Sequence, residues 1–284
     1  MPLIRAYPVD LGQKDVRTGM YDAFVFDDDG IPAWPYETGP DYNITFICHY
    51  ALYQLSLWQR FGREDGLERF EHVSRWVLSH GHETDDSFSF PYEHPLPGLD
   101  SPWLSALGQG RIMSVLTRAA QSTGDDRFQE AARKAVEPLT RAVDDGGVRT
   151  AFPDGSIAFE EYPRTQPNIV LNGLITSLFG LFDVSETGDA TASALLGQAI
   201  EALASNLHRY DLGYWSAYDL TGPIRRVAGD EYHAYHIAQL WALYEMTGKT
   251  EFADRAHAWD ACRGGTRLAI SRFVSRVNTR LRYA

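Results

Sequence analysis

The chain lacks several features that mark large classes of protein. Among its 284 residues it has only two cysteines, Cys48 and Cys262, which excludes a disulfide framework and predicts two buried free thiols in helical segments. No apolar run approaches the ~18 residues that a membrane-spanning helix requires. The opening segment "MPLIRAYPVD" has neither the basic region nor the apolar stretch of a secretory signal. These absences predict a cytoplasmic protein.

Positive charge is also scarce. The chain has 26 Lys and Arg against 38 Asp and Glu, which gives a formal net charge of −12. This charge disfavours general binding of nucleic acid, and any anionic substrate must be met by local cations. Walker, HExxH, CxxC, GxSxG and dinucleotide motifs are all absent, so no common nucleotide or metal site is predicted.

Apolar and aromatic residues, by contrast, are plentiful. Hydrophobic residues make up 44% of the chain, enough for a substantial core. Aromatic residues make up 13%, with 15 Tyr and 7 Trp. Aromatic faces pack well in cores and also suit the C–H faces of sugars.

A repeated pattern organises most of the sequence. Four segments share an apolar helical run, a glycine, a polar turn and a second helical run: "WQRFGREDGLERF", "AAQSTGDDRFQEA", "VSETGDATASALL" and "YEMTGKTEFADRA". A glycine just after a helix is a common stop signal because it adopts the left-handed conformation easily. The pattern predicts four helix hairpins, with first helices near 43–61, 103–122, 167–186 and 231–247 and second helices near 66–80, 126–143, 190–208 and 250–262.

Long connections join these hairpins, at about 81–102, 144–166 and 209–230. Loops of this length in a compact domain are usually functional. Because the glycine turns occupy one end of the hairpins, the long loops are expected at the other end, around a cleft. We therefore predict a mainly α protein, an (α/α) toroid or incomplete barrel over residues 42–263.

The two ends of the chain differ from this pattern. In residues 1–41, "YDAFVFDDDGIPAWPY" alternates apolar and polar residues and predicts a short β-hairpin segment beside the toroid. Its DDDG stretch indicates a turn rather than a calcium loop, because the spaced ligands are missing. Residues 264–284 carry five arginines and no acidic residue. With Ile270, Phe273, Val277 and Leu281 at helical spacing, this tail predicts either a docked amphipathic helix or a weak contact with an anionic surface.

Polar residues in the long loops are the candidates for chemistry. Glu161 and Tyr162 lie in the second connection, Tyr218 in the third, and Tyr232 at the start of the fourth hairpin. These residues could converge at the rim, although a single tyrosine more often packs and forms a hydrogen bond. His233 and His236 lie three apart, but no third ligand accompanies them, so packing or substrate hydrogen bonding is favoured over metal binding.

Four stretches of the sequence resemble segments of one enzyme family, and they occur in the same order as in that family. "WLSALGQGR" (103–111), "EEYPRTQPNIVLNGLITSLFGLFD" (160–183), "YDLGYWSAYDL" (210–220) and "EYHAYHIAQL" (231–240) are similar to segments of the glucuronyl C5-epimerases of heparan sulfate and heparosan synthesis. The resemblance covers roughly residues 30–265. It implies an (α/α) barrel catalytic domain that inverts C5 of D-glucuronate within a glycan to give L-iduronate, without metal or cofactor.

The resemblance also implies roles for particular residues. Glu161 and Tyr232 would be the two acid/base groups, and Tyr162 and Tyr218 would bind the substrate carboxylate and stabilise developing charge. In the animal enzymes an arginine follows the third segment, whereas this chain has Thr221, which leaves Arg225 or Arg226 to supply the positive charge. The remaining expected substrate-binding positions are Trp103, Gln109, Arg164, Asn172, His233 and His236.

Other functions stay open at this point. A polysaccharide lyase begins with the same abstraction of the C5 proton and then eliminates the 4-linked sugar. A glycoside hydrolase needs two carboxylates, for which Glu161 with Asp219 or Asp230 would serve. A non-catalytic sugar-binding or scaffolding module is the third alternative. The expected partners are a uronate-containing polysaccharide or oligosaccharide and a second copy of the chain in a homodimer, and not nucleic acid.

Overall fold

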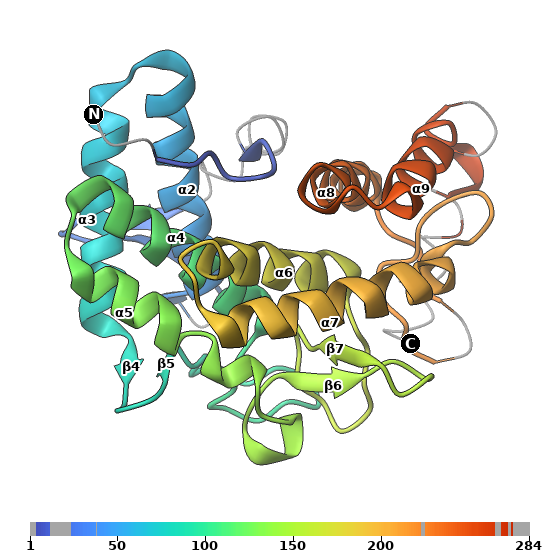
Figure 1. Ribbon diagram of the computed structural model, residues 1–284, viewed down its shortest axis with the longest axis horizontal. Coiled ribbons are helices and arrows are strands. Elements are labelled where there is room, and N and C mark those ends of the chain that lie inside the picture. Colours follow the sequence, from blue (N-terminus) through green and yellow to red (C-terminus); the bar gives the residue numbers. More distant parts are fainter. Residues whose placement is uncertain are drawn as a thin grey trace.

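The computed structural model describes residues 4–11, 24–37, 39–222, 225–264, 268–271 and 274. Helices dominate this part of the chain, and short strands lie between them (Figure 1). The long helices form consecutive antiparallel pairs, as the repeated pattern predicts. The pairs are α2 (Ile44–Phe61) with α3 (Glu64–His80), α4 (Ala106–Thr123) with α5 (Asp126–Lys134), α6 (Leu171–Ser185) with α7 (Ala190–Asn206), and α8 (Asp230–Thr247) with α9 (Thr250–Asp260).

Local capping explains where these helices begin and end. The side chains of Asn43 and Ser105 accept hydrogen bonds from backbone N–H groups in the first turns of α2 and α4, which satisfies donors that the helix leaves free. Gly62 and Gly124 end the same two helices in the left-handed conformation, with φ of 64° and 70°. The predicted hairpin turns are therefore present.

The helix pairs lie side by side around an incomplete ring. The order in space follows the chain: α2 contacts α4, α4 contacts α6, and α6 contacts α8. Figure 1 shows α2 and α3 at one end of this row and α8 and α9 at the other. The predicted mainly α fold, an (α/α) toroid or incomplete barrel, is confirmed.

Short strands occupy the long connections. One hairpin joins β4 (His82–Glu83) to β5 (Phe88–Ser89), and another joins β6 (Arg149–Ala151) to β7 (Ile157–Phe159). In Figure 1 both hairpins lie on the side of the molecule away from the α2–α3 turn. The third connection contains a 3₁₀ turn, Leu207–Tyr210, followed by isolated bridges.

The N-terminal region forms a small antiparallel sheet. Its strands are β1 (Val25–Phe26), β2 (Pro32–Tyr36) and β3 (Gly39–Asp41), in that order. Between β1 and β2, Asp27 Oδ1 accepts the backbone N–H groups of Asp29 and Ile31 at 3.0 and 2.8 Å. This is turn chemistry, as predicted for the DDDG stretch.

Two helix boundaries differ from the sequence prediction. We predict a helix over 126–143, but α5 ends at Lys134. Pro138 lies in the 3₁₀ turn Glu137–Leu139 that follows, and proline cannot continue a helix because it lacks the N–H group and clashes with the preceding turn. We also predict a helix start near 167, whereas α6 starts at Leu171 because residue Ile169 has a φ of +39°.

The N-terminal segment 4–11 packs against α4 and α6. Arg118, on α4, donates hydrogen bonds to the carbonyl oxygens of Arg5 and Ala6 and forms a buried ion pair with Asp183. Tyr7 packs edge-on against Phe179, with ring centroids 5.9 Å apart. The beginning of the described chain is thereby fixed to α4 and α6.

Several other expectations have definite outcomes. Cys48 and Cys262 are free and buried, as predicted. None of the helices in the described residues combines the length and apolar character needed to cross a membrane. Phe273, Val277 and Leu281 lie outside the described residues, so the proposed amphipathic tail and the division into 1–41, 42–263 and 264–284 stay predictions.

Candidate active site

Glu161 lies where the second connection meets the start of α6. Its side chain is 93% buried, since only 7% of the residue is exposed. Asn172 Nδ2 approaches its Oε2 at 3.4 Å. A methyl group on Gly173 would come within 2.4 Å of the same oxygen, so glycine is required for the carboxylate to lie against α6. The helix N-terminus there carries partial positive charge, which favours a carboxylate.

Three tyrosines surround this carboxylate. The phenol of Tyr162 donates a hydrogen bond to Glu161. The rings of Tyr218 and Tyr232 meet edge-on with centroids 4.8 Å apart, and their phenols are hydrogen-bonded. Tyr218 is buried, whereas Tyr232, in the first turn of α8, is 37% exposed. The structure thus brings together the four residues that the sequence names as catalytic.

The electrostatics of the cluster keep all three phenols protonated. The negative charge of Glu161, followed by burial, raises the pKa of Tyr162 well above its usual value. For Tyr218 and Tyr232, burial is the larger cause and Glu161 the second, and the pKa of each is again raised. The site therefore offers the carboxylate of Glu161 as a base beside phenols that can act as acids.

Arginine side chains border the cluster. The Arg226 guanidinium lies 4.3 Å from the centroid of the Tyr218 ring, and its charge lowers the pKa of Tyr218 and Tyr232 in opposition to the stronger raising effects. Arg164 lies 5.9 Å from the Tyr162 ring, and its Nε is buried with no hydrogen-bond partner among the described residues. Arg225 instead donates to the carbonyl oxygens of Leu220 and Gly222. Arg226 is accordingly better placed than Arg225 to meet a substrate carboxylate.

Trp103 connects the cluster to a neighbouring cavity. Its ring lies 5.9 Å from Tyr162 and stacks on Tyr92 at 4.2 Å. Trp103 and Pro163 line a cavity of about 350 Å³, and Asp100 is its only charged lining residue among those that the structure describes. This volume is at the lower end of the ~300–1,000 Å³ that is usual for small-molecule sites.

Three residues expected to bind substrate are buried and bonded to other parts of the protein. Gln109 donates from Nε2 to the carbonyl oxygens of Phe88 and Ala135. His233 stacks on Trp215 at 3.7 Å, and burial lowers its pKa to about 4. Ser216 Oγ is hydrogen-bonded to both His233 and His236. These contacts give the three side chains a role in holding loops and helices together, and their roles in binding substrate stay predictions.

Two residues near the site received no role from the sequence. Tyr92 lies close enough for Glu161 to raise its pKa, in addition to the larger effect of burial. Glu160 is fully buried next to Glu161. No sequence pattern separates Glu160 from Glu161 as the inward-facing carboxylate, because loops lack a fixed side-chain period. In the part of the chain that the structure describes, no group of three metal-ligating side chains occurs.

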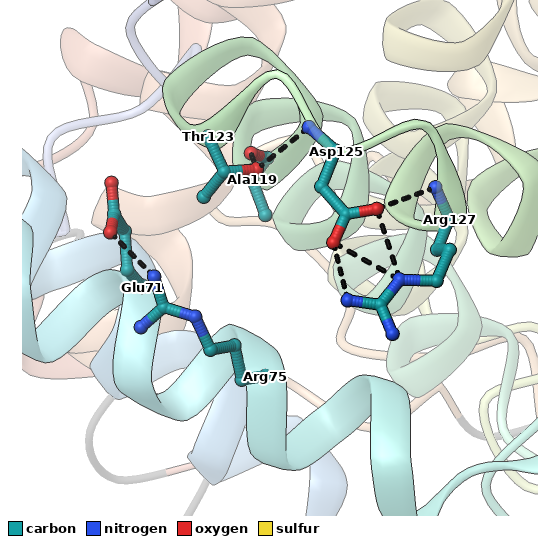
Figure 2. Close-up of polar contacts among 6 residues, drawn as sticks. All are labelled: Glu71, Arg75, Ala119, Thr123, Asp125 and Arg127. Carbon is teal, nitrogen blue, oxygen red and sulfur yellow. Dashed lines mark hydrogen bonds and ion pairs between the residues drawn. The ribbon is translucent and has the colours of Figure 1, made fainter.

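A separate cavity of about 920 Å³ lies between α3 and the start of α5. Figure 2 shows its two arginines, each paired with a carboxylate close by in the chain. Arg75 donates to Glu71 at 2.9 Å, and Arg127 donates to Asp125 at 2.6 Å. Because these charges are already paired, this cavity is a poorer candidate for an anionic sugar than the tyrosine cluster.

Comparison with solved structures identifies the class of fold. A cellobiose 2-epimerase from Bacillus thermoamylovorans superposes with a TM-score of 0.58 at 8% identity, covering 89% of this chain and 72% of that one. A family 76 α-mannanase from Bacteroides thetaiotaomicron gives a TM-score of 0.57 at 12% identity, covering 89% and 70%. At these identities the likeness shows the fold alone, an α/α toroid also found in carbohydrate-modifying enzymes.

Sequence comparison identifies the family. Residues 83–261 match the family described as D-glucuronyl C5-epimerase C-terminus, and the chain belongs to it. It is 33% identical over 196 residues to a D-glucuronyl C5-epimerase of Caenorhabditis elegans, covering 62% of this chain and 32% of the relative. It is 31% identical over 174 residues to an uncharacterized protein of Methanocaldococcus jannaschii, covering 60% and 56%. The matches thus span about a third and about half of these relatives.

Family membership confirms the resemblance seen in the four sequence segments.

Proposed function

We propose that the protein inverts C5 of D-glucuronate residues within a glycan chain, giving L-iduronate. The observation that carries the proposal is the buried carboxylate of Glu161 among the phenols of Tyr162, Tyr218 and Tyr232. Such an arrangement supplies the base and the acid that inversion at one carbon demands.

The reaction begins with removal of the hydrogen on C5, which is α to the sugar carboxylate. Glu161 is the base for this step, and the proton moves from C5 to its carboxylate oxygen. The electrons left on C5 delocalise into the sugar carboxylate, whose negative charge increases. The phenols of Tyr162 and Tyr218 bond to Glu161 and Tyr232 before substrate binds. In the reacting complex their O–H groups turn to donate hydrogen bonds to the sugar carboxylate, and Arg226 offsets its charge.

Reprotonation from the opposite face completes the inversion. Tyr232 donates its phenolic proton to C5, and the resulting phenolate regains a proton from solvent. Its raised pKa supports this role, because the group holds its proton at neutral pH until a stronger base forms nearby. The partial exposure of Tyr232 agrees with exchange with water. In the reverse direction the two residues exchange roles.

The surroundings of the cluster support a polymeric substrate. The cavity beside Trp103 and Pro163 offers space for a sugar next to the reacting uronate. Its one charged residue, Asp100, disfavours a second uronate there and favours a neutral neighbour. A uronate-containing polysaccharide with alternating acidic and neutral sugars fits both features.

The test is incubation with uronate-containing polysaccharides in D2O, followed by NMR at C5. We expect deuterium at C5 and new iduronate signals from the unaltered protein. Glu161→Gln and Tyr232→Phe should each lower the rate by roughly 10²–10⁴-fold, the usual contribution of a general acid or base. Tyr244→Phe, near the other end of α8, is the matched control and should keep the full rate.

Other products would assign the site differently. An unsaturated uronate, detected by its ultraviolet absorbance, would indicate a lyase, which shares the first proton abstraction. New reducing ends without unsaturation would indicate a hydrolase. Binding of the glycan without any chemical change, in both the unaltered protein and Glu161→Gln, would indicate a carbohydrate-binding module.

A further inference from the structure

Glu160, the residue before Glu161, is buried completely. Its backbone joins two parts of the fold: the N–H group donates to Val148 O at 2.8 Å, and the carbonyl accepts from Ala106 N at 2.9 Å. Ala106 is the first residue of α4. The backbone on one side of Glu161 is therefore held at both polar groups.

The carboxylate of Glu160 closes the loop that follows. Its Oε1 accepts the backbone N–H of Asn168 at 3.0 Å, and both of its oxygens lie 3.3 Å from the N–H of Ile169. Ile169 has a φ of +39°, a conformation that costs about 1–3 kcal/mol in a non-glycine residue. On its other side, the carbonyl of Ile169 accepts the phenolic O–H of Tyr210 at 2.8 Å. These bonds hold an unfavourable backbone conformation in place.

The closed loop in turn positions two residues of the site. Asn168 O accepts from Leu220 N at 2.7 Å, and Leu171 N donates to Tyr218 O at 3.0 Å. The segment 168–171 therefore pairs with the carbonyl of Tyr218 and the N–H group of Leu220, on the two sides of Asp219. It also leads directly into the first turn of α6, whose Asn172 and Gly173 contact Glu161.

We propose that Glu160 is a positioning residue for the proton transfer proposed above, on which this inference rests: by accepting hydrogen bonds from Asn168 and Ile169, it keeps Glu161 and Tyr218 in reactive geometry. Full burial excludes contact between Glu160 and a sugar, so it acts only through these neighbours. A misplacement of about 1 Å in a reacting group can cost about 10²-fold in rate. The required property is an acceptor oxygen, not a charge.

The test compares Glu160→Ala with Glu160→Gln in the C5 deuterium-exchange assay. Alanine removes both acceptors, and we expect kcat to fall about 10–100-fold with KM changed less than about twofold. Glutamine keeps one acceptor oxygen, and we expect it to restore kcat to within about fivefold of the unaltered protein. Amide hydrogen exchange at residues 168–171 should become faster in Glu160→Ala and stay slow in Glu160→Gln.

Two further variants separate a loss of positioning from a general loss of stability. Tyr210→Phe retains the buried ring but removes the hydrogen bond to Ile169, and we expect a smaller fall in kcat, about 3–10-fold, even if Glu160→Ala fails to fold. Ser114→Ala removes a buried hydrogen bond to Asp183, distant in the fold from segment 168–171, and should leave kcat unchanged. It controls for general loss of stability.

The outcomes separate this inference from the proposed function. If the unaltered protein exchanges C5 and both Glu160 variants keep its kcat, the positioning role is wrong and the epimerase proposal stands. If Glu160→Gln loses as much activity as Glu161→Gln, Glu160 is an acid/base group and the positioning role is again wrong. If the unaltered protein exchanges no C5 hydrogen in any uronate glycan, both proposals fail.

Discussion

Glu160 and Glu161 are adjacent in the sequence, but their side chains have different hydrogen-bond partners. Glu160 is directed at the backbone N–H groups of Asn168 and Ile169, whereas Glu161 meets the Tyr162 phenol and the start of α6. Burial is the main reason that the pKa of Glu160 rises to about 8, and the nearby charges of Glu161 and Asp219 add to it. The sequence motif names both residues, and only the direction of each side chain separates their roles.

The raised pKa of Glu160 predicts a pH dependence of stability. Its value moves from 4.5 to about 8 on folding, so in this range the folded protein holds a proton that the unfolded chain releases. This stabilising contribution is complete below pH 4.5 and is lost as the pH rises through about 8. Relative to Glu160→Gln, the unaltered protein should lose up to about 1.4 kcal/mol of unfolding free energy per pH unit.

Urea denaturation from pH 5 to pH 9 measures this difference. Glutamine cannot titrate, so ionisable groups that do not interact with Glu160 cancel in the comparison. Parallel stability curves for the two proteins would show that the pKa of Glu160 is not raised.

At the scale of secondary structure, the contact between α4 and α6 depends on small residues. A methyl group on Gly180 would come within 2.4 Å of the carbonyl oxygen of Gly110, and one on Gly110 within 2.5 Å of Thr176 O. The two backbones therefore touch where these glycines cross. This close approach holds the helix that carries Asn172 and Gly173 against the interior of the ring.

The crossing predicts opposite effects for two glycine substitutions. Gly180→Ala should lower the unfolding free energy by about 1–3 kcal/mol, because the added methyl group overpacks the contact between helices. Gly197→Ala, within α7, places its methyl group where nothing lies within 4 Å and should raise stability by up to about 1 kcal/mol. Chemical denaturation of both variants tests the prediction, and equal effects would contradict it.

At the scale of the whole molecule, residues 4–11 are linked to helices far away in sequence. Arg118 and Asp183 are both almost fully buried, and Arg118 also binds the backbone of Arg5 and Ala6. A buried ion pair is costly to break because the remaining charge loses its partner. The connection therefore makes the N-terminal segment part of the same folded unit as α4 and α6.

Removing one partner of this buried ion pair is expected to lower the stability of the protein strongly. Arg118→Ala should lower the unfolding free energy by about 3–5 kcal/mol, since Asp183 would stay buried without a cation. Glu186→Ala removes the partner of Arg5 in a pair that is about half exposed, and should cost less than about 1 kcal/mol. Denaturation monitored by circular dichroism measures both, and similar losses would contradict the assigned role of burial.

The sequence alone determined the local design of this protein. Glycines after apolar helical runs located the hairpins, since the left-handed conformation is most accessible to glycine, and four ordered segments indicated the family. Only the tertiary structure decided which loop residues meet. Ile169 and its partners delay the start of α6, and Arg226 rather than Arg225 lies beside Tyr218. Gln109, His233 and His236 are buried. Loop side chains follow no period, so their directions depend on hydrogen bonds between residues distant in sequence.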